Sequence, residues 1–224
     1  ADASVGGNNG AINGATWTAG KNGGGLGFDG VDDYVEAPDS PSLNITNEIT
    51  VSAWVYYVEN NKYQMIISKP YLSNSNTSPY ASYSLYISSA GVPGLWMTIE
   101  GVGRNLSSSE ALSNGTWNHI VGTYDGSMMK IYINGQLKGS TPVTGSITTY
   151  AAPLRLGTNG GYLQMLNGTL DECRIYSRAL SSQEVHELYD GLHAWYKFNE
   201  DSGTVAADAS VGGNNGAING ATWT

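Results

Sequence analysis

The chain has 224 residues, enough for one large all-β domain, and carries 19 acidic against 10 basic residues, a net charge of −9. This acidic balance excludes the basic face that nucleic acids and anionic membrane surfaces require. Thirty glycines, 40% apolar residues and only 13% charged residues favour short strands joined by tight turns rather than disorder. No apolar run approaches the roughly 18 residues of a membrane span, so membrane insertion is not expected.

Runs of alternating apolar and β-branched residues recur along the chain. They predict strands over residues 33–37, 49–56, 64–67, 83–87, 94–99, 118–124, 129–133, 136–138, 154–157 and 170–176. Asn134-Gly135 favours the type I′ turn of an antiparallel hairpin. Ser181 and Glu184 have the spacing of a capping box, which predicts a helix that ends at Gly191. Many short strands separated by turns are typical of a sandwich or barrel.

The two ends of the chain are identical. Residues 1–18 read ADASVGGNNGAINGATWT, and residues 207–224 read the same. An identity of this length indicates a parent protein built of near-identical tandem units, or an end that was duplicated deliberately.

Several segments, in this order, resemble the laminin-G-like, concanavalin-like domains of bacteria and archaea. The segments are 27–35, 51–55, 117–126, 130–135, 167–172 and 174–181, and the stretch WNHIVGTYDG at 117–126 is similar to the family's WHHVAATYDG. The resemblance covers nearly the whole chain. It implies an all-β, two-sheet antiparallel jelly-roll sandwich with one short helix. It also implies an exported module, extracellular or at the cell surface, that binds sugars, binds proteins or spaces other domains apart.

The family's first strand resembles residues 194–199, which here come last. The resemblance therefore implies that residues 1–190 form a sandwich lacking its usual first strand, and that residues 191–224 are the first strand and following segment of the next repeat. Two outcomes stay open. Residues 192–199 fold back onto their own sandwich, or residues 191–224 dock into a neighbouring molecule, with Ala194, Trp195, Tyr196 and Phe198 in the assembly strand. The second outcome joins copies head to tail into a ring or filament.

Three carboxylates, those of Asp29, Asp32 and Asp33, surround a glycine turn. The resemblance implies that such acids hold a structural Ca²⁺, together with Asp171 and the segment that begins at Asp208, or equally its identical copy that begins at Asp2. The alternative is that these residues only serve turn geometry.

Aromatic residues outside the obvious strands are candidates for stacking on sugar rings; they are Tyr71, Tyr80, Trp96, Tyr150 and Tyr162. The alternative is packing within the sheets, since most of the fifteen tyrosines are expected to form cross-strand pairs. Trp54, Trp117 and Trp195 are expected in the core. The single cysteine, Cys173, is expected to be a buried, inert thiol.

No catalytic residues are expected. Glycosidases need two carboxylates about 5–9.5 Å apart. On this fold, those of the laminarinase-like family place them as Glu-x-Asp-x-(x)-Glu along one strand, a run that this sequence lacks. His119, His186 and His193 have no metal-binding spacing. We therefore expect a non-catalytic repeat module for adhesion or structural assembly, whose partners are further copies of itself, a glycan, or both. The alternative is a carbohydrate-binding module from a larger secreted, glycan-active enzyme.

Overall fold

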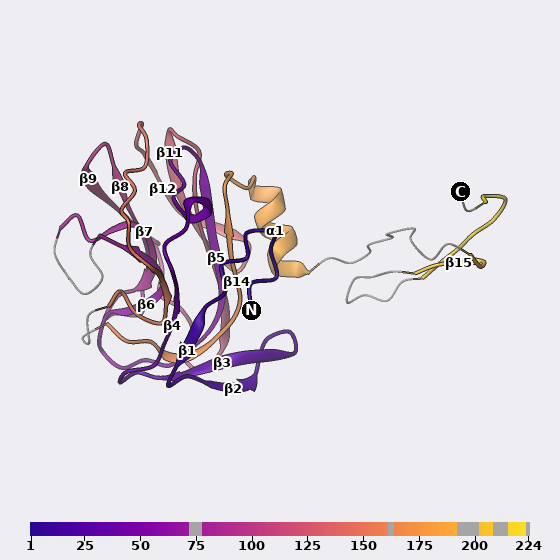
Figure 1. Cartoon of the computed structure of the whole chain (residues 1–224), viewed down its shortest axis with the longest axis horizontal. Helices are drawn as coiled ribbons and strands as arrows, with labels where there is room; N and C mark the ends of the chain where they lie inside the picture. Colours follow the sequence, from indigo (N-terminus) through magenta and orange to yellow (C-terminus); the bar gives the residue numbers. More distant parts are fainter. Residues whose placement is uncertain (72–77, 161–163, 192–201, 208–214, 223–224) are drawn as a thin grey trace.

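The computed structural model describes residues 1–71, 78–160, 164–191, 202–207 and 215–222. Two antiparallel seven-stranded sheets face each other (Figure 1), which confirms the predicted all-β sandwich. The first sheet has the order β1 (Ala11–Asn13), β4 (Tyr34–Ala37), β13 (Leu154–Leu156), β6 (Gln64–Pro70), β7 (Ala81–Ile87), β8 (Pro93–Ile99) and β9 (Val102–Ser107). The second has the order β12 (Gln136–Pro142), β11 (Met128–Ile133), β10 (Trp117–Tyr124), β5 (Ile49–Tyr57), β14 (Asn167–Tyr176), β3 (Gly24–Asp29) and β2 (Thr16–Ala19).

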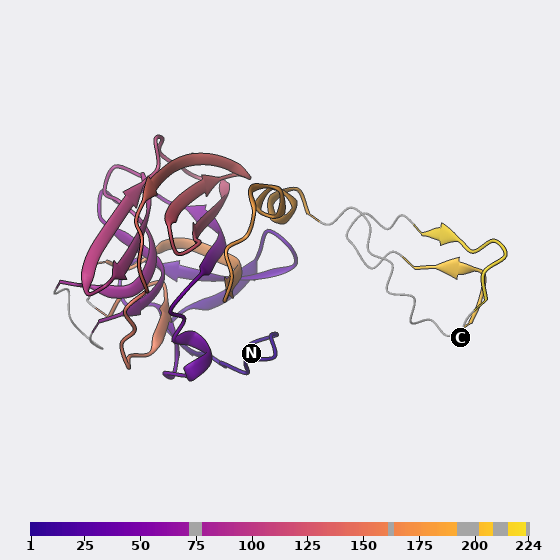
Figure 2. The same ribbon diagram turned by 90° about the horizontal axis from the view of Figure 1, so that it is seen from above.

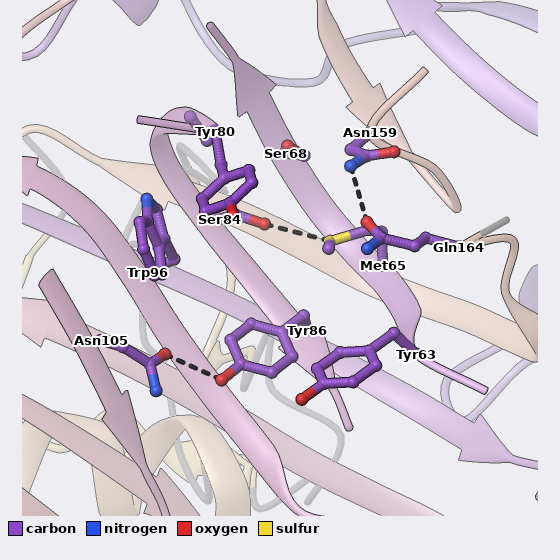
Figure 3. A pocket seen from close by; sticks show the side chains of 11 residues that line it. Tyr63, Met65, Ser68, Tyr80, Ser84, Tyr86, Trp96, Asn105, Asn159 and Gln164 are labelled. Atoms are coloured by element: carbon purple, nitrogen blue, oxygen red, sulfur yellow. Dashed lines mark hydrogen bonds between the residues drawn. The ribbon is translucent and has the colours of Figure 1, made fainter. Parts of the chain in front are cut away.

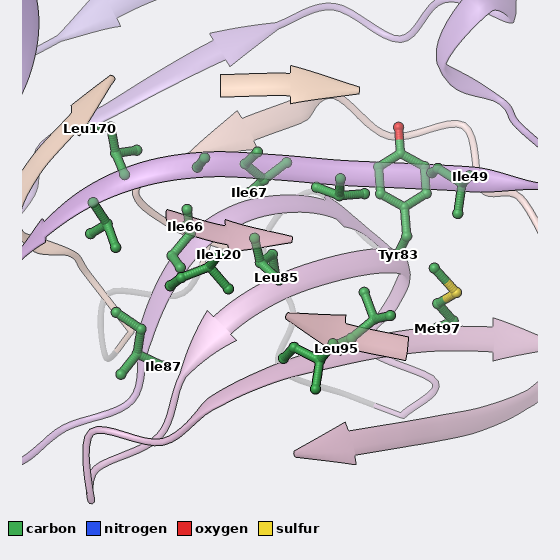
Figure 4. Packing of buried hydrophobic residues seen from close by; sticks show 14 of the residues in the cluster. Ile49, Ile66, Ile67, Tyr83, Leu85, Ile87, Leu95, Met97, Ile120 and Leu170 are labelled. Atoms are coloured by element: carbon green, nitrogen blue, oxygen red, sulfur yellow. The ribbon is translucent and has the colours of Figure 1, made fainter. Parts of the chain in front are cut away.

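The main core lies between the two sheets. Tyr83, Leu85 and Ile87 alternate along β7, and each is fully buried among the side chains shown in Figure 4. Burial of a side chain of this size contributes about 1.5–3 kcal/mol. The residues between them, Ser84 and Tyr86, project from the opposite face of the sheet, because side chains alternate along a strand.

Local turn and cap signals in the sequence match the structure. Asn134 and Gly135 have φ of 50° and 75°, the left-handed pair that a type I′ turn requires. The helix α1 (Ser182–Asp190) begins after the Ser181 N-cap with the complete capping box and ends at Gly191. Among the described residues, no helix is long and apolar enough to span a membrane.

The helix covers the outer face of the second sheet. Val185 is fully buried in a small cluster with residues of β10 and β11. Trp54 and His119 are cross-strand partners, and the Tyr189 ring of α1 stacks on both, at 5.6 and 6.3 Å between ring centroids. Trp54 is thus buried as predicted, but under the helix rather than between the sheets. Trp117 is half-buried, with its ring edge-on to Tyr56, and Trp195 lies outside the described residues.

The expected inert thiol sits on β14. Cys173 is half-buried and packs against the main core. Burial raises the pKa of the Cys173 thiol to about 12, so the thiolate that would react is not formed near neutral pH.

The identical ends of the chain have different surroundings. In the first copy, Ala11–Asn13 form β1 beside β4 and Thr16–Ala19 form β2 beside β3. In the second, Gly216–Ala217 form β16, which pairs with β15 (Val205–Ala206) in a two-stranded sheet of its own, apart from the sandwich (Figures 1 and 2). The predicted assembly residues Ala194, Trp195, Tyr196 and Phe198 lie outside the described residues.

Candidate functional site

A cavity of about 310 Å³ opens on the face of the first sheet that points away from the core. We call it the aromatic cavity; its lining side chains come from β6, β7, β8, β9 and the adjoining loops, and are Tyr63, Met65, Ser68, Tyr80, Ala81, Ser84, Tyr86, Trp96, Asn105, Asn159 and Gln164 (Figure 3). None of these side chains carries a charge near neutral pH.

Two glycines make room for the aromatic rings. A Cβ at Gly94 would overlap the Tyr86 ring, and a Cβ at Gly103 would overlap the Trp96 ring. Each ring therefore covers backbone on the neighbouring strand. Hydrogen bonds hold both in place: Trp96 Nε1–H donates to the Pro79 carbonyl at 2.7 Å, and the Tyr86 hydroxyl donates to Asn105 Oδ1 at 2.8 Å.

The rings form two neighbouring pairs. Tyr80 meets Trp96 edge-on with 5.0 Å between centroids, and Tyr63 lies 5.8 Å from Tyr86. Tyr80 and Tyr63 remain 38% and 46% exposed, so their surfaces are available to a ligand. Tyr80 also has φ of 68°, a left-handed conformation that costs a non-glycine residue about 1–3 kcal/mol. A local strain of this kind is a common feature of binding sites.

Polar groups lie beside the rings. Asn159 Nδ2 donates to Gln164 Oε1 at 2.6 Å, which orders two amides at the same wall (Figure 3). The Ser68 side chain is 1% exposed, and its Oγ is buried with no hydrogen-bond partner in the described part of the chain. A buried hydroxyl left without a partner costs about 1–3 kcal/mol.

A second cavity, of about 670 Å³, lies between α1 and the second sheet. Its lining mixes the Trp54 and Tyr189 rings with both signs of charge, and includes Lys21, Glu172, Arg174, Arg178, Glu184, Glu187 and Asp190. Arg178 pairs with Glu184 at 2.7 Å, and Arg174 pairs with Glu172. Burial lowers the pKa of His119 to about 4, so its ring is neutral near pH 7. The arginines are already paired, and we place the candidate site at the aromatic cavity.

The predicted glycan-binding residues divide into two groups. Tyr80 and Trp96 both line the aromatic cavity, whereas Tyr71 packs edge-on against Tyr150 at 4.6 Å outside its lining. Tyr162 lies outside the described residues. The other nine lining residues were not predicted from the sequence, namely Tyr63, Met65, Ser68, Ala81, Ser84, Tyr86, Asn105, Asn159 and Gln164. For Tyr86 a signal was available, because it occupies an outward position between buried neighbours on β7.

The structure brings three of the five predicted metal ligands together. Asp29, Asp32 and Asp33 each bring a carboxylate oxygen within 4.8 Å of the others. Burial, and then repulsion from Asp29 and Asp32, raises the pKa of Asp33, a repulsion that a bound cation would offset. Asp171 is not in this group; its Oδ2 accepts the Asn22 N–H at 2.8 Å. Asp208 lies outside the described residues. A Ca²⁺ site at the three carboxylates stays a prediction.

Known proteins share parts of this sequence and this fold. Residues 29–186 match the family described as the concanavalin A-like lectin/glucanases superfamily. The adhesion G-protein coupled receptor V1 of Danio rerio is 27% identical over 82 residues, which span 33% of this chain and 1% of that receptor. The chain thus corresponds to a very small part of this curated relative.

Two solved structures share the fold. The binding domain of Paraclostridial Mosquitocidal Protein 1 has a TM-score of 0.62 and 18% identity, covering 82% of this chain and 48% of that one. Domain 4 of AbnA, a GH43 extracellular arabinanase from Geobacillus stearothermophilus solved with arabinotriose, has a TM-score of 0.60 and 22% identity. That match covers 80% of this chain and 87% of that one.

Proposed function

The chain belongs to the concanavalin A-like lectin/glucanases superfamily, and from this premise we propose that it is a non-catalytic, extracellular binding module whose aromatic cavity takes a neutral glycan. The observation that carries the proposal is the cavity itself. It presents four aromatic rings beside amide and hydroxyl groups, and none of the described residues in its lining is charged. This combination suits a sugar ring, which has an apolar face of C–H groups and an edge of hydroxyls.

The chemistry of the lining favours neutral over anionic sugars. A carboxylate or sulfate would need a cation, and the lining residues that the structure describes supply none. The net charge of −9 adds a general repulsion between this protein and polyanions. The Asn105, Asn159 and Gln164 amides instead offer donors and acceptors that match hydroxyl groups.

The proteins with similar folds support a binding role. One is the binding domain of a mosquitocidal protein, and another was solved with arabinotriose. The curated relative is an adhesion receptor, which supports a place outside the cell or on its surface. The same cavity would serve an adhesion module or a carbohydrate-binding module of a larger glycan-active enzyme, and the sequence flanking this chain would separate these two settings.

The test is a screen of neutral and anionic oligosaccharides followed by calorimetry on the best ligand. We expect binding to a neutral glycan, a loss of about tenfold or more with Trp96→Ala, and no loss with Trp17→Ala. Trp17 is the matched control because it is 72% exposed on the edge strand β2 of the other sheet. Equal losses in both variants, or selective binding of anionic glycans, would contradict the proposal. Hydrolysis of the bound glycan would contradict the proposal that the module is non-catalytic.

The identical ends favour a second candidate function, head-to-tail assembly with further copies of this chain. Such assembly is compatible with glycan binding, because an array of weak sites gains avidity. Light scattering over a range of protein concentrations tests it. Assembly predicts that the molar mass rises with concentration above 23.7 kDa, and a constant monomer mass would refute it.

A further inference from the structure

Residues 1–18 fit a specific place on the sandwich, which we call the N-terminal docking site and define by residues 24–27 and 33–36. Ala11–Asn13 pair with Tyr34–Glu36 of β4, and Thr16–Ala19 pair with Gly24–Gly27 of β3. The segment therefore adds an edge strand to each of the two sheets. Its Ala15 is 8% exposed and belongs to the main core.

The glycines of this segment are matched to the docking site. A Cβ at Gly10 would overlap Val35, and a Cβ at Gly14 would overlap the Asp33 carboxylate. Gly14 also has φ of 74°, which disfavours any L side chain. The fit thus depends on glycine at two positions, and both are repeated in the second copy as Gly216 and Gly220.

The second copy shares the left-handed glycine of the first without the same surroundings. Gly220 has φ of 73°, against 74° at Gly14. Nothing else in the described part of the chain lies within 4 Å of a Cβ built at Gly220. Ala221, the counterpart of the buried Ala15, is exposed. The second copy therefore has the left-handed glycine that the docked segment requires, but not the packing partners of the first copy.

We propose that residues 207–224 of one molecule occupy the N-terminal docking site of a second copy, in place of that copy's residues 1–18. This inference rests on the assembly candidate above and specifies its contact surface. The exchanged segments are identical, so the donated segment makes the same pairings and packing on the sandwich as the segment that it replaces. The sixteen residues 191–206 that connect α1 to the donated segment have an extended reach of about 50 Å, enough to bridge two sandwiches.

Exchange of identical segments makes the equilibrium between monomers and multimers depend on the protein concentration. The recipient's own segment is tethered, with an effective concentration on the order of mM, so monomers prevail in dilute solution. Each recipient still carries its own second copy to donate, so the contact is heterologous and adds further molecules.

The two copies provide a matched pair of variants, Gly14→Ala and Gly220→Ala. An alanine at a left-handed position weakens docking by roughly tenfold. Gly14→Ala weakens the chain's own segment and leaves the donated one intact, so we expect a shift to multimers of the 23.7 kDa chain at lower protein concentration. Gly220→Ala weakens the donated segment, so we expect multimers only at roughly tenfold higher protein concentration than in the wild type. Size-exclusion chromatography with light scattering measures both.

A synthetic peptide with the sequence of residues 1–18 completes the test. Excess peptide should dissociate the Gly14→Ala multimers, and a peptide with alanine at its fourteenth position should not. If Gly14→Ala does not fold, the unmodified peptide should restore its thermal transition, and failure to do so overturns the inference.

Other results separate this inference from the assembly candidate. Multimers that resist both Gly220→Ala and the peptide mean assembly through another surface, so only the docking inference fails. A folded Gly14→Ala monomer at all concentrations overturns the docking inference, and monomers in every protein, wild type included, refute assembly as well. Glycan affinity, measured separately, is expected to be unchanged in both variants.

Discussion

Gly103→Ala changes the aromatic cavity without adding or removing a group that contacts the ligand. A Cβ at Gly103 would lie 3.0 Å from Cη2 of Trp96, 3.3 Å from Cε2, and closer still to Cζ2. Because nonbonded carbon atoms prefer separations of about 3.5–4.0 Å, the indole must retreat by about 1 Å. The ring also carries the hydrogen bond to Pro79 and the edge contact with Tyr80, so both would be disturbed.

The expected effect is a loss of glycan affinity with little loss of stability. The Trp96 ring lies on the outer face and not in the main core, so its displacement leaves the packing between the sheets unchanged. A stacking contact displaced by this amount loses about 1 kcal/mol or more, which is roughly five- to tenfold in affinity. Calorimetry with the glycan from the screen measures the affinity, and urea unfolding measures the stability.

Gly24→Ala is the matched control. Gly24 lies on β3 of the other sheet, and no heavy atom within the described residues comes within 4 Å of its added Cβ. We expect wild-type affinity from this variant. If Gly103→Ala binds the glycan as tightly as Gly24→Ala does, the Trp96 ring does not form the binding surface and the reasoning is refuted.

Three further predictions concern stability. Lys69 is fully buried and donates to Asp39 at 2.6 Å and to the carbonyls of Tyr150 and Ala152. Lys69→Met removes all three hydrogen bonds and leaves the Asp39 carboxylate with its contact to Asn44 but without its cation. Urea unfolding should show a loss of about 3 kcal/mol, and an unchanged midpoint would contradict this. The pKa of His119 is about 4 in the folded protein, below its ordinary value of 6.5, so the unfolded chain binds a proton more readily. The free energy of unfolding should therefore be highest above pH 6.5 and fall as the pH drops toward 4. In His119→Gln it should fall less steeply. Millimolar Ca²⁺ should raise the Tm of the wild type but not of Asp32→Asn, and equal shifts would exclude the three-carboxylate site.

Much of the fold could be predicted because local signals agreed with the final structure. The alternation along residues 83–87 places the same side chains in the core that the structure buries, and the Ser181–Glu184 box begins the helix at the predicted residue. The strands that the pattern missed are β1, β2, β3, β9, β15 and β16. These are short or rich in glycine and polar residues, and they owe their conformation to pairing with a neighbour, which a local pattern does not contain.

The aromatic cavity could be predicted only in part. Tyr80 and Trp96 stand out as large aromatic residues, but Asn105 and Gln164 belong to segments far apart in the sequence. They meet because β8 and β9 pair with Trp96 opposite Asn105, while Gln164 follows β13, which pairs with β6. Register between strands is a tertiary property, so composition and spacing do not contain it. Tyr71 was predicted to bind glycan but lies outside the cavity, because it packs on Tyr150, a loop residue that only the fold brings near.

The most direct test of the glycan proposal is a titration of the ¹⁵N-labelled protein with the best neutral glycan, followed through the six tryptophan indole N–H signals. Trp96→Phe assigns the Trp96 signal. The proposal predicts that this indole signal and the side-chain amides of Asn105, Asn159 and Gln164 shift together, while the indole of Trp54 under α1 stays in place. Shifts concentrated at Trp54, with Trp96 unaffected, would place the ligand in the second cavity and contradict the proposal.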